Sequence, residues 1–338
     1  MLSIDSPPVP EPQEPATPLA PEVMLANGRR LLLEGMSTEE LHRLQWEQEQ
    51  RFAKAILALP KGSSERALVI GQAYDTVCTI LAAQQAGEGP LVMGVDRRYT
   101  RLVLELLNRQ IYRGIGQPRL FEIGYGSGTM LKEVSNHGFR VSGIEVSSAM
   151  RDEALGVLGE TFSDRLLLGD LCNISREMLP DKPSLVYWNY VFEHICPDEI
   201  GDYLQRIHQL LIPGGTLVTI TPHWLMRPSD VTGDFCLPRT EARGLHLKEY
   251  RLAEVSRLLK QSGFRRVATP LVVSQQRIYL AGGGLRLLKQ LCEGLFDRLP
   301  VRHAHALCLG AGMSITLATK SSQPIRRSPR KPYPWECS

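Results

Sequence analysis

The sequence predicts an α/β protein in which a helical N-terminal section precedes a doubly wound, mostly parallel seven-stranded sheet. Two observations support this prediction. Before residue 116 apolar residues recur at helical spacing, without convincing alternation of apolar and polar residues. After residue 116 short apolar runs alternate with amphipathic segments, the arrangement typical of strand–helix–strand units in a parallel sheet.

The helical section is expected to contain three helices. The first opens with Ser37 followed by Glu40, the spacing of a capping box, and stops at Pro60. The second begins at Ser63 or Ser64, and the third runs through residues 97–113.

Seven apolar runs are expected to form the strands. They are residues 119–124, 140–146, 165–170, 184–190, 215–221, 266–273 and 306–320. Because helices cover both faces of a parallel sheet, such strands read as continuous apolar runs. A further amphipathic helix is expected at residues 283–299.

Four segments follow from this reading. Residues 1–26 are Pro-rich and acidic and are expected to be a disordered tail. Residues 27–116 would cover a substrate or contact a partner, 117–320 would form the sheet domain, and 321–338 would be a disordered basic tail. No signal peptide and no membrane-spanning run is recognisable, so a cytoplasmic protein is expected.

Composition limits the classes of function. The net charge of +3 is too small to indicate nucleic acid or a membrane surface as the main partner. The cysteines are scattered without a CxxC pair, which argues against a disulfide framework and a zinc cluster. The sequence also has no HxxxH spacing, and His303 and His305 are expected to be an exposed loop pair, so no metal site is expected.

The strongest motif is LFEIGYGSGTM at residues 120–130. Glu122 lies in an apolar strand, and the glycines that follow let the backbone approach a ligand at the start of a helix. A dinucleotide-binding GxGxxG motif would need its third glycine at position 129, which is Thr129. This spacing argues against a nicotinamide-dependent oxidoreductase, which stays a weaker alternative.

This motif resembles the first motif of the class I S-adenosylmethionine (SAM)-dependent methyltransferases. The resemblance covers about residues 117–275 and the closing strand near 306–320. It implies a Rossmann-like sheet domain that binds SAM as its cofactor. The cofactor contacts implied at this turn come from Glu122, Gly124, Tyr125, Gly126 and Gly128. Tyr125 stands where relatives often have a smaller residue, so it is expected against the cofactor edge.

Two further acidic residues end the next two expected strands. Glu145, followed by Val146, can accept hydrogen bonds from both ribose hydroxyls. The resemblance implies that Asp170 binds the adenine amino group while Leu171 packs on the ring. Either residue alone would equally fit a strand end at the surface. Together with Glu122 they favour a ligand at the carboxyl edge of the sheet.

Candidate catalytic residues follow the fourth and fifth strands. Asn189, which ends the fourth strand, is a further expected cofactor contact. Glu193-His194 resembles the EH segment of methyltransferases related to the ubiquinone and menaquinone enzymes. His194 is a candidate general base for a hydroxyl acceptor, because its ordinary pKa lies near neutrality. The alternative is that it only holds its loop. His223 and His246 are expected to face the acceptor.

The sequence therefore predicts a SAM-dependent methyltransferase that acts on a small organic acceptor, a metabolite or natural product. A protein acceptor, or a non-catalytic SAM-binding protein, stays open. Asn189 is not followed by the PPY or PPF of nucleic-acid methyltransferases. The helical section and the long loop at 224–245 are expected to cover the pocket. The aromatic candidates for acceptor contact, which core packing would explain equally well, are Tyr74, Tyr99, Tyr112, Trp224 and Phe235.

Overall fold

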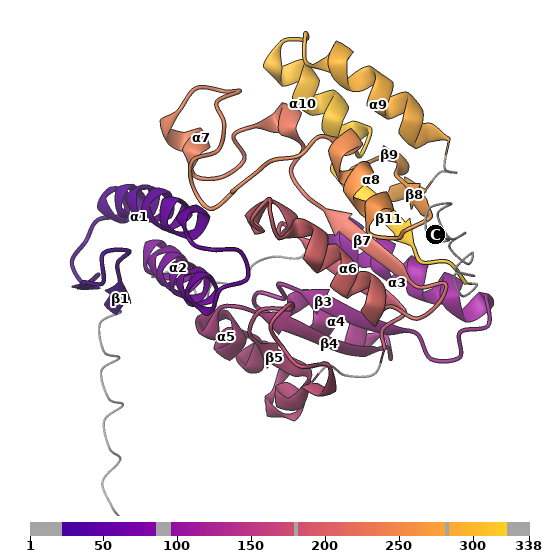
Figure 1. The fold of residues 1–338 in the computed structure, drawn as a ribbon, viewed down its shortest axis with the longest axis horizontal. Coiled ribbons are helices and arrows are strands. Elements are labelled where there is room, and N and C mark those ends of the chain that lie inside the picture. The colour runs from indigo at the N-terminus through magenta and orange to yellow at the C-terminus, as the bar shows by residue number, and fades with distance from the viewer. Residues whose placement is uncertain (1–21, 86–95, 179–181, 281–283, 323–338) are drawn as a thin grey trace, which may run out of the picture.

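The predicted α/β fold is confirmed by the computed structural model, which describes residues 22–85, 96–178, 182–280 and 284–322 (Figure 1). The central seven-stranded sheet has the order β5-β4-β3-β6-β7-β11-β8. Strand β11 pairs antiparallel with both of its neighbours, whereas the other pairings are parallel. The chain turns to opposite sides of the sheet from β3 and β6, and ligands bind α/β sheets where the strand order reverses.

The strands of this sheet follow the predicted apolar runs. Their bounds are β3 Arg119–Ile123, β4 Arg140–Glu145, β5 Leu166–Leu168, β6 Leu185–Asn189, β7 Thr216–Ile220, β8 Arg266–Ala268 and β11 Ile315–Thr319. The predicted strand at 266–273 splits, because β9 (Pro270–Val273) leaves the sheet and pairs with β10 (Ile278–Leu280).

The predicted strand at 306–320 was too long at its start. Residues Val301–Gly310 form helix α10, in which Ala304 and Cys308, one turn apart, are both buried. A short apolar run fits either a strand or a buried helix face, and here the helical spacing prevails. The preceding helix α9 (Leu285–Phe296) was predicted correctly.

Helices cover both faces of the sheet. On one face lie α3 (Arg97–Tyr112), α4 (Thr129–Asn136) and α5 (Ser148–Leu158); on the other lie α6 (Ile200–Leu210) and α8 (Leu252–Gln261). Strand β6 serves both cores, since Trp188 packs toward α6 and Tyr187 toward α3. Helix α3 therefore belongs to the sheet domain and not to a separate section at 27–116.

Helices α1 (Thr38–Ala58) and α2 (Ser64–Gln84) pack together beside the sheet (Figure 1). The capping box of Ser37 and Glu40 is present, and Ser63 caps α2. A hairpin of β1 (Glu22–Met24) and β2 (Arg30–Leu32) was not predicted. Residues 22–26 are therefore structured; the rest of the expected N-terminal tail, and residues 323–338, lie outside the described residues.

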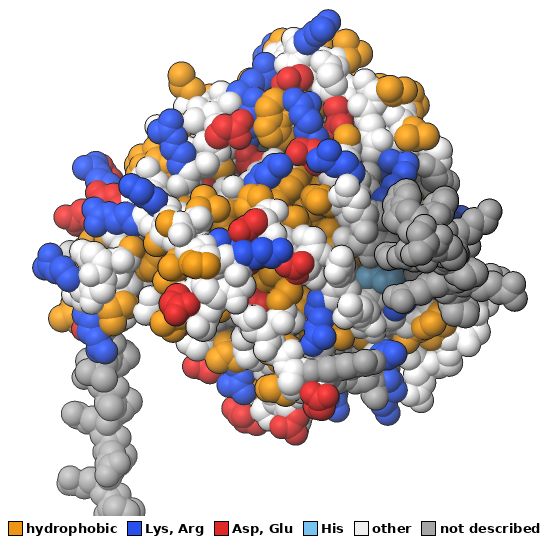
Figure 2. All heavy atoms as spheres, viewed as in Figure 1, with side chains coloured by type: hydrophobic (Ala, Val, Ile, Leu, Met, Phe, Trp, Pro, Cys, Tyr) orange, Lys and Arg blue, Asp and Glu red, His pale blue; other side chains and the backbone are white. Residues whose placement is uncertain are grey.

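The surface, the cysteines and the helices add three facts. Basic and acidic side chains are interspersed over the face shown in Figure 2. The six cysteines within the described residues are unpaired. Among the helices described, none combines the length and the apolar character needed to span a bilayer.

Candidate active site

A cavity of about 660 Å³ opens at the carboxyl ends of β3, β4 and β6. This volume lies in the range of about 300–1,000 Å³ that small-molecule sites occupy. Its walls come from the turn after β3, the ends of β4, β5 and β6, helix α2 and the start of α3. The predicted residues that line it are Glu122, Gly124, Tyr125, Gly126, Glu145, Val146, Asp170, Leu171, Asn189 and His194.

The glycine turn after β3 forms the base of the cavity. Gly124 and Gly126 have φ values of 68° and 51°, which side chains rarely adopt. A Cβ on Gly124 would lie 2.5 Å from Val191 Cγ2, so packing also requires glycine there. Gly128 caps α4 and contacts Ala154 and Leu158 of α5, not the cavity. Packing against α5 thus requires glycine at this position.

Two buried carboxylates stand side by side above this turn. Burial raises the pKa of Glu122 well above its usual range, and the nearby charge of Glu145 adds to the effect. Glu122 Oε2 has no hydrogen-bond partner among the described residues. Glu145 accepts hydrogen bonds from the backbone N–H groups of Gly126 at 3.0 Å and Val146 at 2.8 Å. Burial raises the pKa of Glu145 despite these bonds.

The third carboxylate, Asp170, follows β5. It accepts a hydrogen bond from the backbone N–H of Cys172 at 2.7 Å, and the Tyr203 hydroxyl donates to its other oxygen. Burial raises its pKa. Since parallel strands end at the same edge, the three predicted carboxylates meet at one cavity.

Aromatic side chains line the rest of the cavity. Of the predicted candidates, Tyr74 and Tyr99 line it, but Tyr112 is 90% exposed. Trp224 lies between the guanidinium groups of Arg227 and Arg251, and Phe235 stacks on Trp46. Three tyrosines that sequence reasoning missed also line the cavity: Tyr187, Tyr190 and Tyr203.

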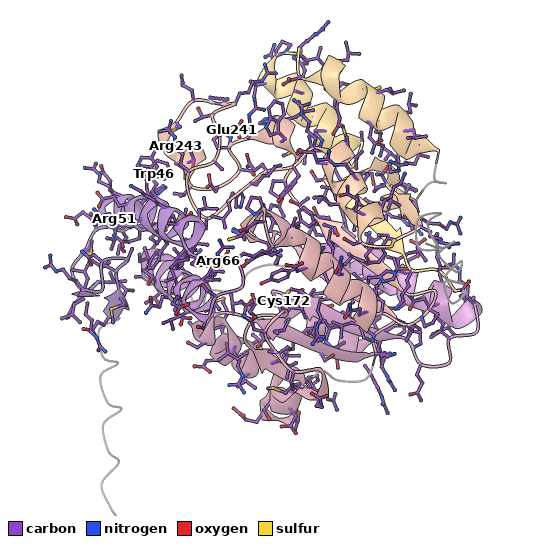
Figure 3. All side chains as sticks on the ribbon, in the orientation of Figure 1. Trp46, Arg51, Arg66, Cys172, Glu241 and Arg243 are labelled. Carbon is purple, nitrogen blue, oxygen red and sulfur yellow. The ribbon has the colours of Figure 1, made fainter. Side chains whose placement is uncertain are left out.

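The predicted cover was partly wrong. Residues 224–245, all of which are described, do not line the cavity. Trp46 of α1 faces the part of this loop that carries Glu241 and Arg243 (Figure 3). The loop packs on α1 because Phe235 stacks on Trp46, with ring centroids 5.2 Å apart.

Helix α2 provides the cover instead, and contacts on both sides hold it in place. Asp75 accepts hydrogen bonds from the hydroxyls of Ser147 at 2.7 Å and Ser148 at 3.1 Å, beside Glu145. At the other side Arg66 reaches from α2 toward the segment before α6 (Figure 3), where it pairs with Asp198 and Glu199 at 2.9 Å. No local motif in α2 marks these residues, because their role depends on contacts distant in sequence.

The three predicted histidines have different positions. His194 lines the cavity, and its Nδ1 lies 2.8 Å from the backbone oxygen of Leu245. Burial, assisted by the neighbouring His246, lowers the pKa of His194 to about 3. It is therefore neutral near pH 7, with Nδ1–H donating to Leu245.

His223 does not face the cavity. It is 1% exposed and its Nε2 lies 2.7 Å from Glu293 Oε1 of helix α9, while its Nδ1 accepts from the backbone N–H of Leu225. These contacts join the end of β7 to α9, so we do not retain it as a catalytic candidate. His246 is also buried, but its ring lies against that of His194, with centroids 4.7 Å apart.

Comparison with known proteins identifies relatives of this chain. A family model described as a methyltransferase domain matches residues 47–269. An uncharacterized methyltransferase of Oceanobacillus iheyensis is 33% identical over 130 residues, which are 38% of this chain and 58% of that protein. A carboxy-S-adenosyl-L-methionine synthase of Pseudomonas aeruginosa is 31% identical over 106 residues, 29% of this chain and 43% of that protein. The chain thus spans about half the length of these relatives.

A solved structure is also similar. It is the magnesium protoporphyrin IX methyltransferase of Synechocystis PCC 6803 with bound S-adenosylhomocysteine (SAH), at 13% identity and a TM-score of 0.45. The similarity covers 75% of this chain and 99% of that protein. A likeness of this extent adds nothing on the acceptor.

Proposed function

The chain belongs to the methyltransferase-domain family of class I SAM-dependent methyltransferases, and on this premise we propose that it methylates a small organic acceptor. SAM, the cofactor that the sequence predicted, is the methyl donor of this family. Because the chain belongs to this family, we do not retain the nicotinamide-dependent oxidoreductase as an alternative. The observation that best supports the proposal is that a glycine turn and three carboxylates line one cavity.

The donors and acceptors of the cavity suit SAM. SAM carries a sulfonium and an ammonium group, and the carboxylates of Glu122, Glu145 and Asp170 form no ion pair with Lys or Arg in the described part of the chain. Glu122 Oε2 and Asn189 Oδ1 are buried acceptors without a described partner. Buried acceptors of this kind are costly unless a ligand supplies the donor.

We assign the cofactor contacts as follows. Glu145 binds the ribose hydroxyls, Asp170 and Leu171 bind the adenine, and Glu122 with the Gly124–Gly126 backbone receives the amino-acid end. When bound, SAM supplies an already activated methyl group, so the protein contributes mainly alignment of the two reactants.

We place the acceptor beside the start of α3 and the segment after β6, next to Tyr74 of α2. The rest of α2 lies along the cofactor end, where Asp75 contacts Ser147. Tyr74, Tyr99 and Tyr190 make the acceptor end largely apolar, with hydroxyls that can orient a polar group. Tyr190 has a φ of 55°, an uncommon conformation that occurs at binding sites. A pocket of this kind, covered by a helix, fits a small molecule better than an extended peptide.

His194 is a poor general base in this setting. A group with a pKa of about 3 removes a proton from an ordinary hydroxyl inefficiently near neutral pH. Because it lines the cavity, His194 can still help to shape the site for the acceptor.

Calorimetric titration of the purified protein with SAM, SAH and NAD tests the proposal. We expect SAM and SAH to bind with one site per chain and NAD not to bind. Failure of both SAM and SAH to bind would defeat the assignment of the cavity.

A further inference from the structure

A second cluster of ligand-type side chains lies in the wall of the cavity, behind the glycine turn. Donor atoms of Glu193, His194 and His246 all lie within 4.8 Å of one another. His246 Nε2 lies 3.9 Å from Glu193 Oε1, too far for a hydrogen bond. Glu193 is 0% exposed, and its Oε1 has no hydrogen-bond partner among the described residues.

Each of these side chains is held by its other polar atom. Glu193 Oε2 accepts a hydrogen bond from the Thr221 hydroxyl at 2.9 Å. His194 donates through Nδ1 to a backbone carbonyl, and His246 Nδ1 lies 3.5 Å from Glu249 Oε1. Imidazoles that bind metals characteristically give their second N–H to a carbonyl or carboxylate in this way.

The charges around the cluster leave room for a cation. Three more acidic side chains bind the backbone nearby. Glu49 accepts a hydrogen bond from Leu245 N–H, Asp230 from Gly244 N–H and Glu249 from Ser229 N–H. They are paired with amides and hydroxyls, and no Lys or Arg forms an ion pair with them in the described ranges. Buried carboxylates without a positive partner are strongly unfavourable.

We propose that Glu193, His194 and His246 bind a divalent transition-metal ion in the wall of the cavity. Two nitrogens and one carboxylate oxygen suit Mn²⁺, Fe²⁺, Co²⁺ or Zn²⁺ better than Mg²⁺ or Ca²⁺. Two atoms that bind one ion at about 2.0–2.2 Å lie at most about 4.4 Å apart, so small side-chain movements would close the site. The sequence missed it because His246 is distant from His194 along the chain.

The role of this metal rests on the function proposed above, because it concerns the acceptor of the methyl group. Of the three proposed ligands only His194 lines the cavity, so an acceptor oxygen would reach the ion from the His194 side. An acceptor hydroxyl bound there would lose its proton to solvent more easily. Its oxygen then forms a bond to the methyl carbon, the carbon–sulfur bond breaks, and the electron pair stays on sulfur, giving a methyl ether and SAH. The acceptor class is therefore a compound with an oxygen that can bind a metal.

Metal binding is tested on the tag-free full chain after treatment with EDTA and dialysis. We expect one equivalent of Mn²⁺ or Co²⁺ per chain, followed by electron paramagnetic resonance or by Co²⁺ absorption. Glu193→Gln and His246→Gln should each weaken binding at least about tenfold. Equal affinity in the parent and both variants would overturn the proposal.

Two control variants distinguish the proposed site from other groups that could bind the metal. His137→Gln changes an exposed histidine far from the cluster in the chain. Asp198→Asn changes a second acidic cluster, Cys196–Asp198–Glu199, which Arg66 already neutralises. Neither should alter metal affinity by more than about twofold; a loss in Asp198→Asn that matches Glu193→Gln would contradict the proposed ligands.

If the variants fail to fold, a measurement on the unmodified protein still tests the proposal. Pulsed electron paramagnetic resonance of bound Mn²⁺ should show nitrogen couplings from two imidazoles, and the lack of such couplings would overturn the proposal. SAM binding is measured separately on the metal-free protein. SAM binding without metal binding rejects only the metal site, and metal binding without SAM binding rejects only the proposed function.

Discussion

The two ends of the cavity are built in different ways. At the cofactor end, contacts come from one sheet edge, where β3, β4 and β5 each contribute a carboxylate or glycine close to a strand end. At the acceptor end, contacts come from the start of α3, the segment after β6 and Tyr74 of α2, with support from Leu245, while the rest of α2 lies along the cofactor end. The first end depends on short motifs, and the second on contacts between distant segments. Changes at the two ends should therefore separate cofactor binding from acceptor binding.

Gly126→Val is expected to have the largest effect. Its φ of 51° disfavours a β-branched residue, and its N–H holds Glu145. SAM affinity, measured by calorimetry, should fall at least about 100-fold, equal to roughly 2.7 kcal/mol, while circular dichroism shows the fold retained. Gly156→Ala, on α5 with open space around its Cβ, is the matched control and should bind SAM like the parent.

Glu145→Ala should weaken SAM binding by about 1–3 kcal/mol, because the ribose hydroxyls lose their acceptor. The measurement is a titration with SAM at pH 7.5. Glu153→Ala, a half-buried residue of α5 that does not line the cavity, serves as the control. Parent-like affinity in Glu145→Ala would show that the ribose lies elsewhere.

Arg66→Ala tests the attachment of the cover. The variant leaves the largely buried Glu199 without its cation, and we expect about 1–2 kcal/mol lower unfolding free energy, less than for a fully buried pair because Asp198 is half-exposed. Urea denaturation measures this. Lys61→Ala removes an exposed pair with Asp202 from the same region and should cost less than Arg66→Ala, because solvent screens exposed ion pairs. A larger loss in Lys61→Ala than in Arg66→Ala would contradict the role of Arg66.

Tyr74→Phe should have the smallest effect on the cofactor. Tyr74 lies on α2 with its ring 5.6 Å from that of His194, at the acceptor end. SAM affinity should change by less than about twofold, whereas turnover of an identified acceptor should fall. A SAM loss as large as that of Glu145→Ala would remove the distinction between the two ends.

The cofactor end was predictable because its determinants are local. A buried strand, a turn that needs positive φ and an acidic residue at a strand end can each be recognised within a few residues. Once the strands are parallel, their carboxyl ends share an edge, so Glu122, Glu145 and Asp170 had to converge. Gly128 differs, since it packs against α5 and does not line the cavity.

The sequence alone determined the α/β fold, the glycine turn and the acidic residues that follow it along the chain. Only the tertiary structure decided which distant residues meet them. It placed α2 over the cavity, turned His223 toward Glu293 and brought His246 to Glu193 and His194. The physical reason is that hydrogen bonds and packing across long separations, such as Glu49 with the backbone N–H of Leu245, set these positions and leave no periodic trace in the sequence.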